Sequence, residues 1–311
     1  MRSHDPDHDE SGQDDSPGRD SALTTFNQHR GLLFSIAYRM VGSVTDAEDL
    51  LQDAFIRWQE AAGDPDIRSP KAFLITAVSR LCINHLQSAR VQREEYVGQW
   101  LPEPLATDAA SDPIGVLRAD ESISMAFLVM LERLTPVERA VFLLRETFDY
   151  KYADIAATLG LEEANCRQIL RRALQHVRAA RPRFTASLRE HDDLLDRFRE
   201  ATRSGDMGQL LALLADDVVL HADGGGKAAA VPNVLHGSGR IARGILGGIS
   251  KLLPRNLVQR IIQINGRSAF VSYLDGQPHS VLTLDVGSGR IQAIYIVTNP
   301  EKLVHLPPAP K

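Results

Sequence analysis

Hydrophobic residues recur every three or four positions through much of the chain up to about residue 184, the spacing that places them on one face of a helix. Leu33, Ile36, Ala37 and Met40 form the first such run. A second run follows the turn at Gly42, and further runs occur after residue 72 and after residue 116. The pattern predicts that the first part of the chain is helical.

Polar and proline-rich stretches divide this helical part. Residues 1–22 are rich in Asp, Ser and Gly and contain very few apolar side chains, so we expect a disordered acidic tail. Residues 96–115 have the composition of a linker and contain the run Trp100-Leu-Pro-Glu-Pro104. We therefore expect two helical units, residues 23–95 and residues 116–184.

The hydrophobic spacing changes after Phe184. Two helical runs precede segments rich in Val, Ile, Tyr and Thr, which favour strands. The expected strands are Val218–His221, Val258–Ile264, Ala269–Leu274, Ser280–Val286 and Arg290–Thr298. Pairs such as Asn265-Gly266 between them predict tight hairpin turns. Residues 189–307 are therefore predicted to form an α+β unit with a mainly antiparallel sheet.

The distribution of charge, the cysteines and the lack of long apolar runs limit the partners and cofactors that the chain can be expected to bind. The net charge of -5 averages over segments of opposite sign, because residues 68–93 and 167–183 carry basic side chains and no Asp or Glu. Cys82 and Cys166 lie far from any Cys/His cluster, so we expect no metal and no cofactor. No apolar run approaches the roughly 18 residues that a membrane helix needs, and no signal peptide is recognisable, so we expect no membrane contact and a cytoplasmic location.

Residues 152–172 have the spacing of a helix-turn-helix. That motif needs a small residue where its helices cross, a turn glycine that takes positive φ, and an apolar residue in the second helix, and Ala156, Gly160 and Cys166 meet these needs. Arginine and glutamine can read guanine and adenine in the major groove. The candidates for DNA contact are Arg167, Gln168, Arg171, Arg172 and Arg178. The alternative is a surface helix whose arginines are only solvated.

Asp49, Gln52 and Asp53 are three and four residues apart, so they share one polar face of a helix, opposite Leu50 and Leu51. Taken alone, such a face can be simple solvation. The surrounding segment from Ala37 to Phe55 resembles the helical region by which sigma factors dock on the clamp of RNA polymerase. That resemblance implies that the three polar residues contact polymerase.

Residues 69–86 resemble the sigma-factor segment that melts and reads the minus-10 promoter element. Holding an unpaired strand and a flipped base requires a basic surface with polar or aromatic pockets. The candidates are Arg80, Asn84, His85, Arg90 and Arg93. Asn84 and Gln87 depart from the Asp and Arg that the family usually has there.

With these regions in this order, residues 26–184 resemble the extracytoplasmic-function (ECF) sigma factors. The resemblance implies an alternative sigma factor that binds core RNA polymerase at its clamp and flap and directs it to double-stranded and melted promoter DNA, with the helix-turn-helix on the minus-35 element. Three further motifs resemble the signatures of the subgroup that carries a fused C-terminal SnoaL-like, NTF2-like domain, a cone with a curved sheet. They consist of Trp100, Leu101, Pro102, Glu103 and Pro104; Asp223, Gly224, Gly225, Gly226 and Lys227; and Asn299, Pro300, Glu301, Lys302 and Leu303.

The role of the third unit does not follow from its fold, because one fold serves many functions. The resemblance implies a built-in regulator whose motifs contact the sigma domains or their linker, and we predict that it is not an enzyme. The unit also contains acid and base groups that can in principle converge, namely His221, Asp223, Lys227 and His279. Whether the unit binds a small ligand stays open. Two alternatives are a ligand-sensing helix-turn-helix regulator that binds its operator without polymerase, and an NTF2-like isomerase or cyclase with a DNA-binding appendage. A further alternative is that the prolines form a spacer and the terminal motif only caps the last strand.

Overall fold

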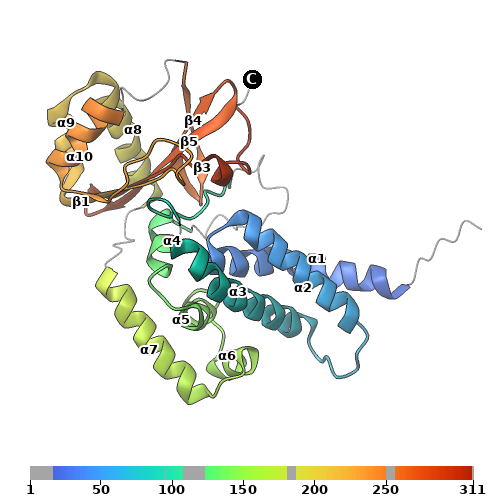
Figure 1. The fold of residues 1–311 in the computed structure, drawn as a ribbon. Coiled ribbons are helices and arrows are strands. Elements are labelled where there is room, and N and C mark those ends of the chain that lie inside the picture. The colour runs from blue at the N-terminus through green and yellow to red at the C-terminus, as the bar shows by residue number, and fades with distance from the viewer. Residues whose placement is uncertain (1–16, 95, 108–122, 181–186, 250–255, 310–311) are drawn as a thin grey trace, which may run out of the picture.

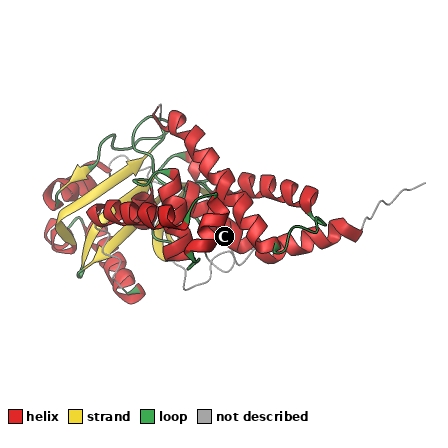
Figure 2. Cartoon of the chain, turned by 90° about the horizontal axis from the view of Figure 1, so that it is seen from below, coloured by secondary structure: helices red, strands yellow, loops and turns green. Residues whose placement is uncertain are grey.

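The computed structural model describes residues 17–94, 96–107, 123–180, 187–249 and 256–309, which form three units joined side by side (Figure 1). The third unit lies at the top of the view in Figure 1 and the helices of the first two units lie below it, and Figure 2 shows all the strands on one side of the molecule. No helix among these residues is long and apolar enough to cross a membrane.

The first unit consists of α1 (Pro17–Val41), α2 (Val44–Ala61) and α3 (Pro70–Glu94). Helix α1 begins inside the predicted tail, so the prediction of a disordered segment over residues 1–22 is too long at its end. Ala22 is buried and its carbonyl accepts a hydrogen bond of 2.9 Å from the Trp58 indole, which ties this turn of helix to α2. Residues 1–16 of that prediction lie outside the described residues.

The second unit consists of α4 (Met125–Leu131), α5 (Pro136–Phe142), a π-helical turn at Leu143–Thr147, α6 (Tyr152–Leu159) and α7 (Glu163–Ala180). Thr135 and Glu138 form the capping box at the start of α5. Gly160 ends α6 with a φ of 68°, and Cys166 is buried between the helices. The helix-turn-helix prediction is confirmed.

The third unit begins with α8 (Leu188–Ser204) and α9 (Met207–Leu213). It continues with β1 (Leu214–Asp223), β2 (Leu235–His236), α10 (Ser238–Gly244), a π-helical turn at Ile245–Ile249, β3 (Val258–Ile264), β4 (Arg267–Leu274), β5 (Gln277–Gly287), β6 (Arg290–Val297) and a 3-10 turn at Pro300–Lys302. The strands form one sheet in the order β2-β1-β6-β5-β4-β3. The predicted α+β architecture, with helices first and the sheet after them, is confirmed.

The sheet is mainly antiparallel, as predicted, and contains one parallel pair. Strands β3 to β6 pair as successive antiparallel hairpins, whereas β1 pairs with β6 in parallel. The chain leaves β1 through β2 and α10 and returns through three hairpins, which leaves β6 running in the same direction as β1. Two-residue β2 is too short to show a strand pattern in the sequence.

Both faces of the sheet are covered. On one face, Phe270 and Ile294 pack in a core with Phe198 of α8 and Leu210 of α9. On the other face, apolar residues from the linker and α4 join a core with strand residues, among them Leu101, Met125, Ala126, Tyr273, Val281 and Tyr295. Residues 101–106 of the segment expected to be a linker are therefore packed between the units.

Candidate functional site

The predicted polymerase-binding face is exposed on α2. Asp49, Gln52 and Asp53 point to solvent, while Leu50 and Leu51 are buried in the core of the first unit. Ile56 lies one turn farther on the same face and is 53% exposed. Ile56 was not among the predicted contact residues, although an apolar side chain on an otherwise polar helix face is visible in the sequence.

The minus-10 candidates lie along α3. Arg80 and Asn84 are exposed, and the Arg80 Nε donates a hydrogen bond of 3.1 Å to the Thr158 carbonyl of α6. His85 is half-buried, with its Nε2 3.4 Å from the carboxylate of Asp46. The side chains of two further candidates, Arg90 and Arg93, lie outside the described residues. The structure therefore brings one end of the predicted minus-10 surface against the helix-turn-helix.

The predicted DNA-reading face is the outer face of α7. Gln168, Arg171 and Arg172 are exposed there. Arg167 is also exposed, but its guanidinium pairs with Glu163 at 2.7 Å and lies 4.9 Å from the centre of the Tyr152 ring. The side chain of Arg178 lies outside the described residues.

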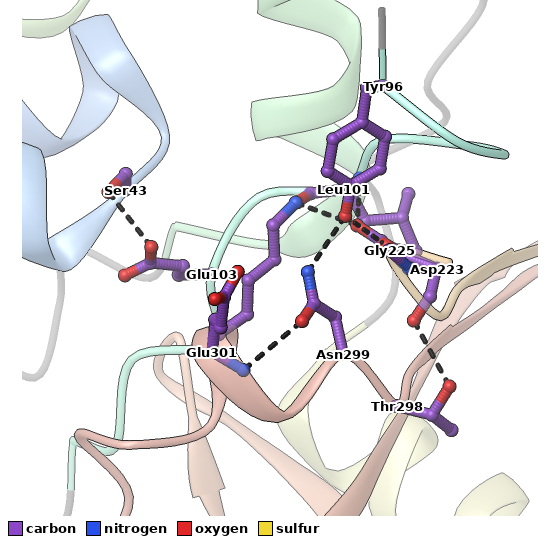
Figure 3. A network of polar contacts seen from close by, with 10 residues as sticks. Ser43, Tyr96, Leu101, Glu103, Asp223, Gly225, Thr298, Asn299 and Glu301 are labelled. Carbon is purple, nitrogen blue, oxygen red and sulfur yellow. Dashed lines mark hydrogen bonds and ion pairs between the residues drawn. The ribbon is translucent and has the colours of Figure 1, made fainter. Parts of the chain in front are cut away.

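The three motifs of the linker and third unit meet at one carboxylate, that of Asp223, which is fully buried at the end of β1 (Figure 3). Its Oδ1 accepts hydrogen bonds from the Tyr96 hydroxyl at 2.5 Å and the Gly225 amide at 3.0 Å. Its Oδ2 accepts from the Leu101 amide at 2.8 Å and from Lys302 Nζ at 2.7 Å. Four donors therefore satisfy this buried charge, and two of them come from the linker.

Lys302 is the cation of this cluster and is 7% exposed. Its ammonium also donates to the Leu101 carbonyl and lies 4.2 Å from the centre of the Trp100 ring and 5.0 Å from that of Tyr96. Two aromatic rings, a carbonyl and a carboxylate thus surround the charge. Burial and the neighbouring Asp223 raise the pKa of the Tyr96 hydroxyl. We call Asp223, Lys302, Tyr96, Trp100 and Leu101 the Asp223 cluster.

The glycines and Asn299 shape the rim of this cluster. Asn299 donates to the Tyr96 hydroxyl at 2.9 Å, and its Oδ1 caps the amide of Glu301. A Cβ on Gly225 would lie 2.4 Å from Asn299 Nδ2, so only glycine allows this approach. At the surface, Lys227 forms an ion pair with Glu301.

Glu103 faces the first unit and not the third. Its carboxylate accepts hydrogen bonds from the Ser43 hydroxyl at 2.9 Å and from the Val44 and Thr45 amides at 2.7 and 3.3 Å. These amides belong to the first turn of α2, where a negative group is favourable. Glu103 therefore attaches the linker to α2.

Three of the four acid and base candidates of the third unit bind partners outside this set. Asp223 binds Lys302, and Lys227 binds Glu301. His221 stacks on Tyr295 with ring centres 5.3 Å apart and its Nδ1 lies 3.0 Å from the Gln99 amide oxygen. Its pKa is lowered to about 4 by burial and by the charges of His236 and Arg133, so it is neutral at pH 7. Within the described residues, no group of three or more His, Cys, Asp and Glu side chains is placed to hold a metal ion.

Comparison with known proteins identifies the helical units. The Sigma-70 region 2 family matches residues 25–91, and the Sigma-70 region 4 family matches residues 124–177. The first unit thus carries region 2 of a sigma factor, and the second carries region 4.

Full-length relatives share the same organisation. The chain is 34% identical over 296 residues to the ECF RNA polymerase sigma factor SigJ of Mycobacterium tuberculosis, covering 92% of this chain and 94% of the relative. It is 32% identical over 286 residues to the probable ECF sigma factor SigI of the same organism, covering 91% and 95%. The crystal structure of SigJ superposes with a TM-score of 0.73 at 31% identity, over 91% of this chain and 98% of that one. The chain belongs to the ECF RNA polymerase sigma factors, alternative sigma factors that direct RNA polymerase to promoters.

Proposed function

We propose that this sigma factor binds core polymerase through Asp49, Gln52 and Asp53 of α2. The observation that supports this is that the three side chains are exposed on one face of the helix, while Leu50 and Leu51 on its opposite face are buried. Ile56 extends the face with an apolar group, the composition typical of a protein interface centre with a polar rim.

We propose further that α3 contacts the minus-10 element and that Gln168, Arg171 and Arg172 of α7 read the minus-35 element. Their exposure on the second helix of a helix-turn-helix supports this, because that helix enters the major groove. The chain acts in the cytoplasm, where its polymerase and DNA partners are, and has no catalytic activity of its own.

The third unit, in our proposal, regulates the sigma units by holding the linker. The observation that carries this is the Asp223 carboxylate, which binds the Tyr96 hydroxyl and Leu101 amide of the linker together with Lys302 of the terminal motif. Buried polar groups with complete hydrogen bonding fix one arrangement, and losing a partner is costly.

Sequencing the transcripts made by core polymerase reconstituted with this chain tests the sigma activity. We expect a set of start sites with shared minus-10 and minus-35 sequences, and start sites identical to those of core polymerase alone would contradict the proposal. Transcription from the identified promoter by the full chain and by a chain cut before Asn299 tests the regulation. Equal activity of the two forms would contradict a regulatory role.

A further inference from the structure

Three hairpin turns of the sheet have the same local structure. In each, a residue with positive φ precedes a glycine: Asn265 at 56°, Asp275 at 51° and Ser288 at 54°. Asp275 and Ser288 are exposed, as turn residues normally are. Asn265 is 1% exposed, so this turn between β3 and β4 is inserted into the rest of the molecule.

Every polar group of Asn265 bonds outside its own unit. Its amide donates to the Leu105 carbonyl at 2.8 Å, and its Oδ1 accepts from the Leu105 amide at 3.1 Å. Its Nδ2 donates to the Tyr38 hydroxyl at 2.7 Å, and its carbonyl accepts from the Ile123 amide at 3.1 Å. One residue therefore contacts α1, the linker and the segment that leads into α4.

Tyr38 extends this contact toward the polymerase-binding helix. It is fully buried, and its hydroxyl donates a hydrogen bond of 2.6 Å to the Glu103 carbonyl, while the Glu103 carboxylate binds the first turn of α2. Burial raises the pKa of the Tyr38 hydroxyl, which keeps it a donor. Hydrogen bonds in such a water-excluded chain strengthen one another.

We propose that Asn265 is a second anchor between the third unit and the sigma units, separate from the Asp223 cluster, and that it stabilises the closed arrangement in which the first unit, the linker and the second unit meet. The two anchors share no residue, and neither Asn265 nor Tyr38 belongs to the three sequence motifs. The regulatory consequence rests on the proposed function of the third unit, whereas the anchoring itself does not.

The test measures the distance between the first and third units. Cysteines introduced at exposed positions, Gln59→Cys in α2 and Gln277→Cys in β5, take spin labels, while the native Cys82 and Cys166 are buried. Double electron–electron resonance then gives the distribution of distances between the two labels, and from it the populations of closed and separated forms in the full chain.

The variant Asn265→Gly keeps the positive φ and the two backbone hydrogen bonds but removes both side-chain bonds. Tyr38→Phe removes the shared hydroxyl without touching the turn. Net contributions of one or two hydrogen bonds correspond to a roughly 5- to 30-fold rise in the ratio of separated to closed forms, and we expect this for both variants. Ser288→Gly is the matched control, because it also replaces a turn residue of positive φ by glycine, but in a turn that is exposed.

Distance distributions of Asn265→Gly and Tyr38→Phe that match the Ser288→Gly control would overturn the anchor. Transcription by the same variants separates the two claims. If both variants shift the distances but transcribe like the control, the anchor stands and the regulatory role of the third unit fails. If both also change transcription, the anchor is part of that regulation.

Discussion

Replacing Lys302 by methionine removes the cation of the Asp223 cluster while keeping an unbranched side chain of similar length. Asp223 is 0% exposed, so its carboxylate would stay in the protein without its counter-charge. Breaking a buried ion pair in this way costs about 3–5 kcal/mol, because one ion is left desolvated and uncompensated. At about 1.4 kcal/mol per factor of ten, the closed form of the cluster becomes about a hundredfold to a few thousandfold less favoured.

Trp100 reports the change directly, since its ring covers the Lys302 ammonium. Acrylamide quenching of tryptophan fluorescence should rise in Lys302→Met, while the other tryptophan, Trp58, is only 5% exposed in the first unit. Glu301→Gln is the control, because the ion pair it breaks is exposed and contributes little.

The double variant Asp223→Asn/Lys302→Met removes both charges. Because no buried ion is then left unpaired, we expect quenching between that of the wild type and that of the single variant. Unchanged quenching in Lys302→Met, or a double variant at least as strongly quenched as the single one, would refute the reasoning.

Three further predictions concern the polymerase-binding face of α2, the exposed face of α7 and a buried carboxyl group, that of Asp285. Asp49→Lys/Asp53→Lys should compete poorly for core polymerase in a pull-down while keeping the thermal midpoint of the wild type, because both side chains are exposed. Arg171→Ala or Arg172→Ala should lose about 1–3 kcal/mol of binding and relax preference at one base position in promoter selection, whereas loss of a phosphate contact would weaken all sequences alike. Burial raises the pKa of Asp285 to about 6, so the folded state favours its protonated form and loses stability as the pH rises through about 6. Asp285→Asn should therefore have the higher thermal midpoint at pH 8, and the difference should shrink as the pH is lowered from about 6 toward about 4.

Much of the fold follows from local patterns in the sequence. The turn at Gly160 and the helical spacing depend on residues close in sequence, and the structure has them as predicted. The parallel pairing of β1 with β6 joins residues about seventy positions apart, and no local pattern encodes its direction. The composition of the linker likewise gave no sign that Pro102 and Glu103 are buried, because that burial comes from the packing of the units around them.

The candidate site likewise has features that local sequence predicts and features that depend on tertiary packing. The polar face of α2 and the exposed face of α7 follow from helical spacing, whereas the meeting of the three motifs at Asp223 was expected only from a family resemblance. The hairpin turn at Asn265 could be predicted, but its burial could not. Asp275 and Ser288 sit in turns of the same conformation, and only tertiary packing distinguishes the three.

The spacing of the two promoter elements can be compared with the distance between the helices proposed to bind them. The minus-10 and minus-35 elements lie about 25 base pairs apart, which is about 85 Å along B-DNA at about 34 Å per ten base pairs. In the described arrangement α3 contacts α6 through the bond from Arg80 to the Thr158 carbonyl, and α7, with 18 residues, is about 27 Å long. Surfaces so close together cannot reach both elements at once if α3 and α7 have the roles proposed for them. With those proposed roles, the first and second units would separate before the promoter is bound. Asn265 bonds to α1, to the linker and to the segment entering α4, so its contacts cannot all persist through that separation.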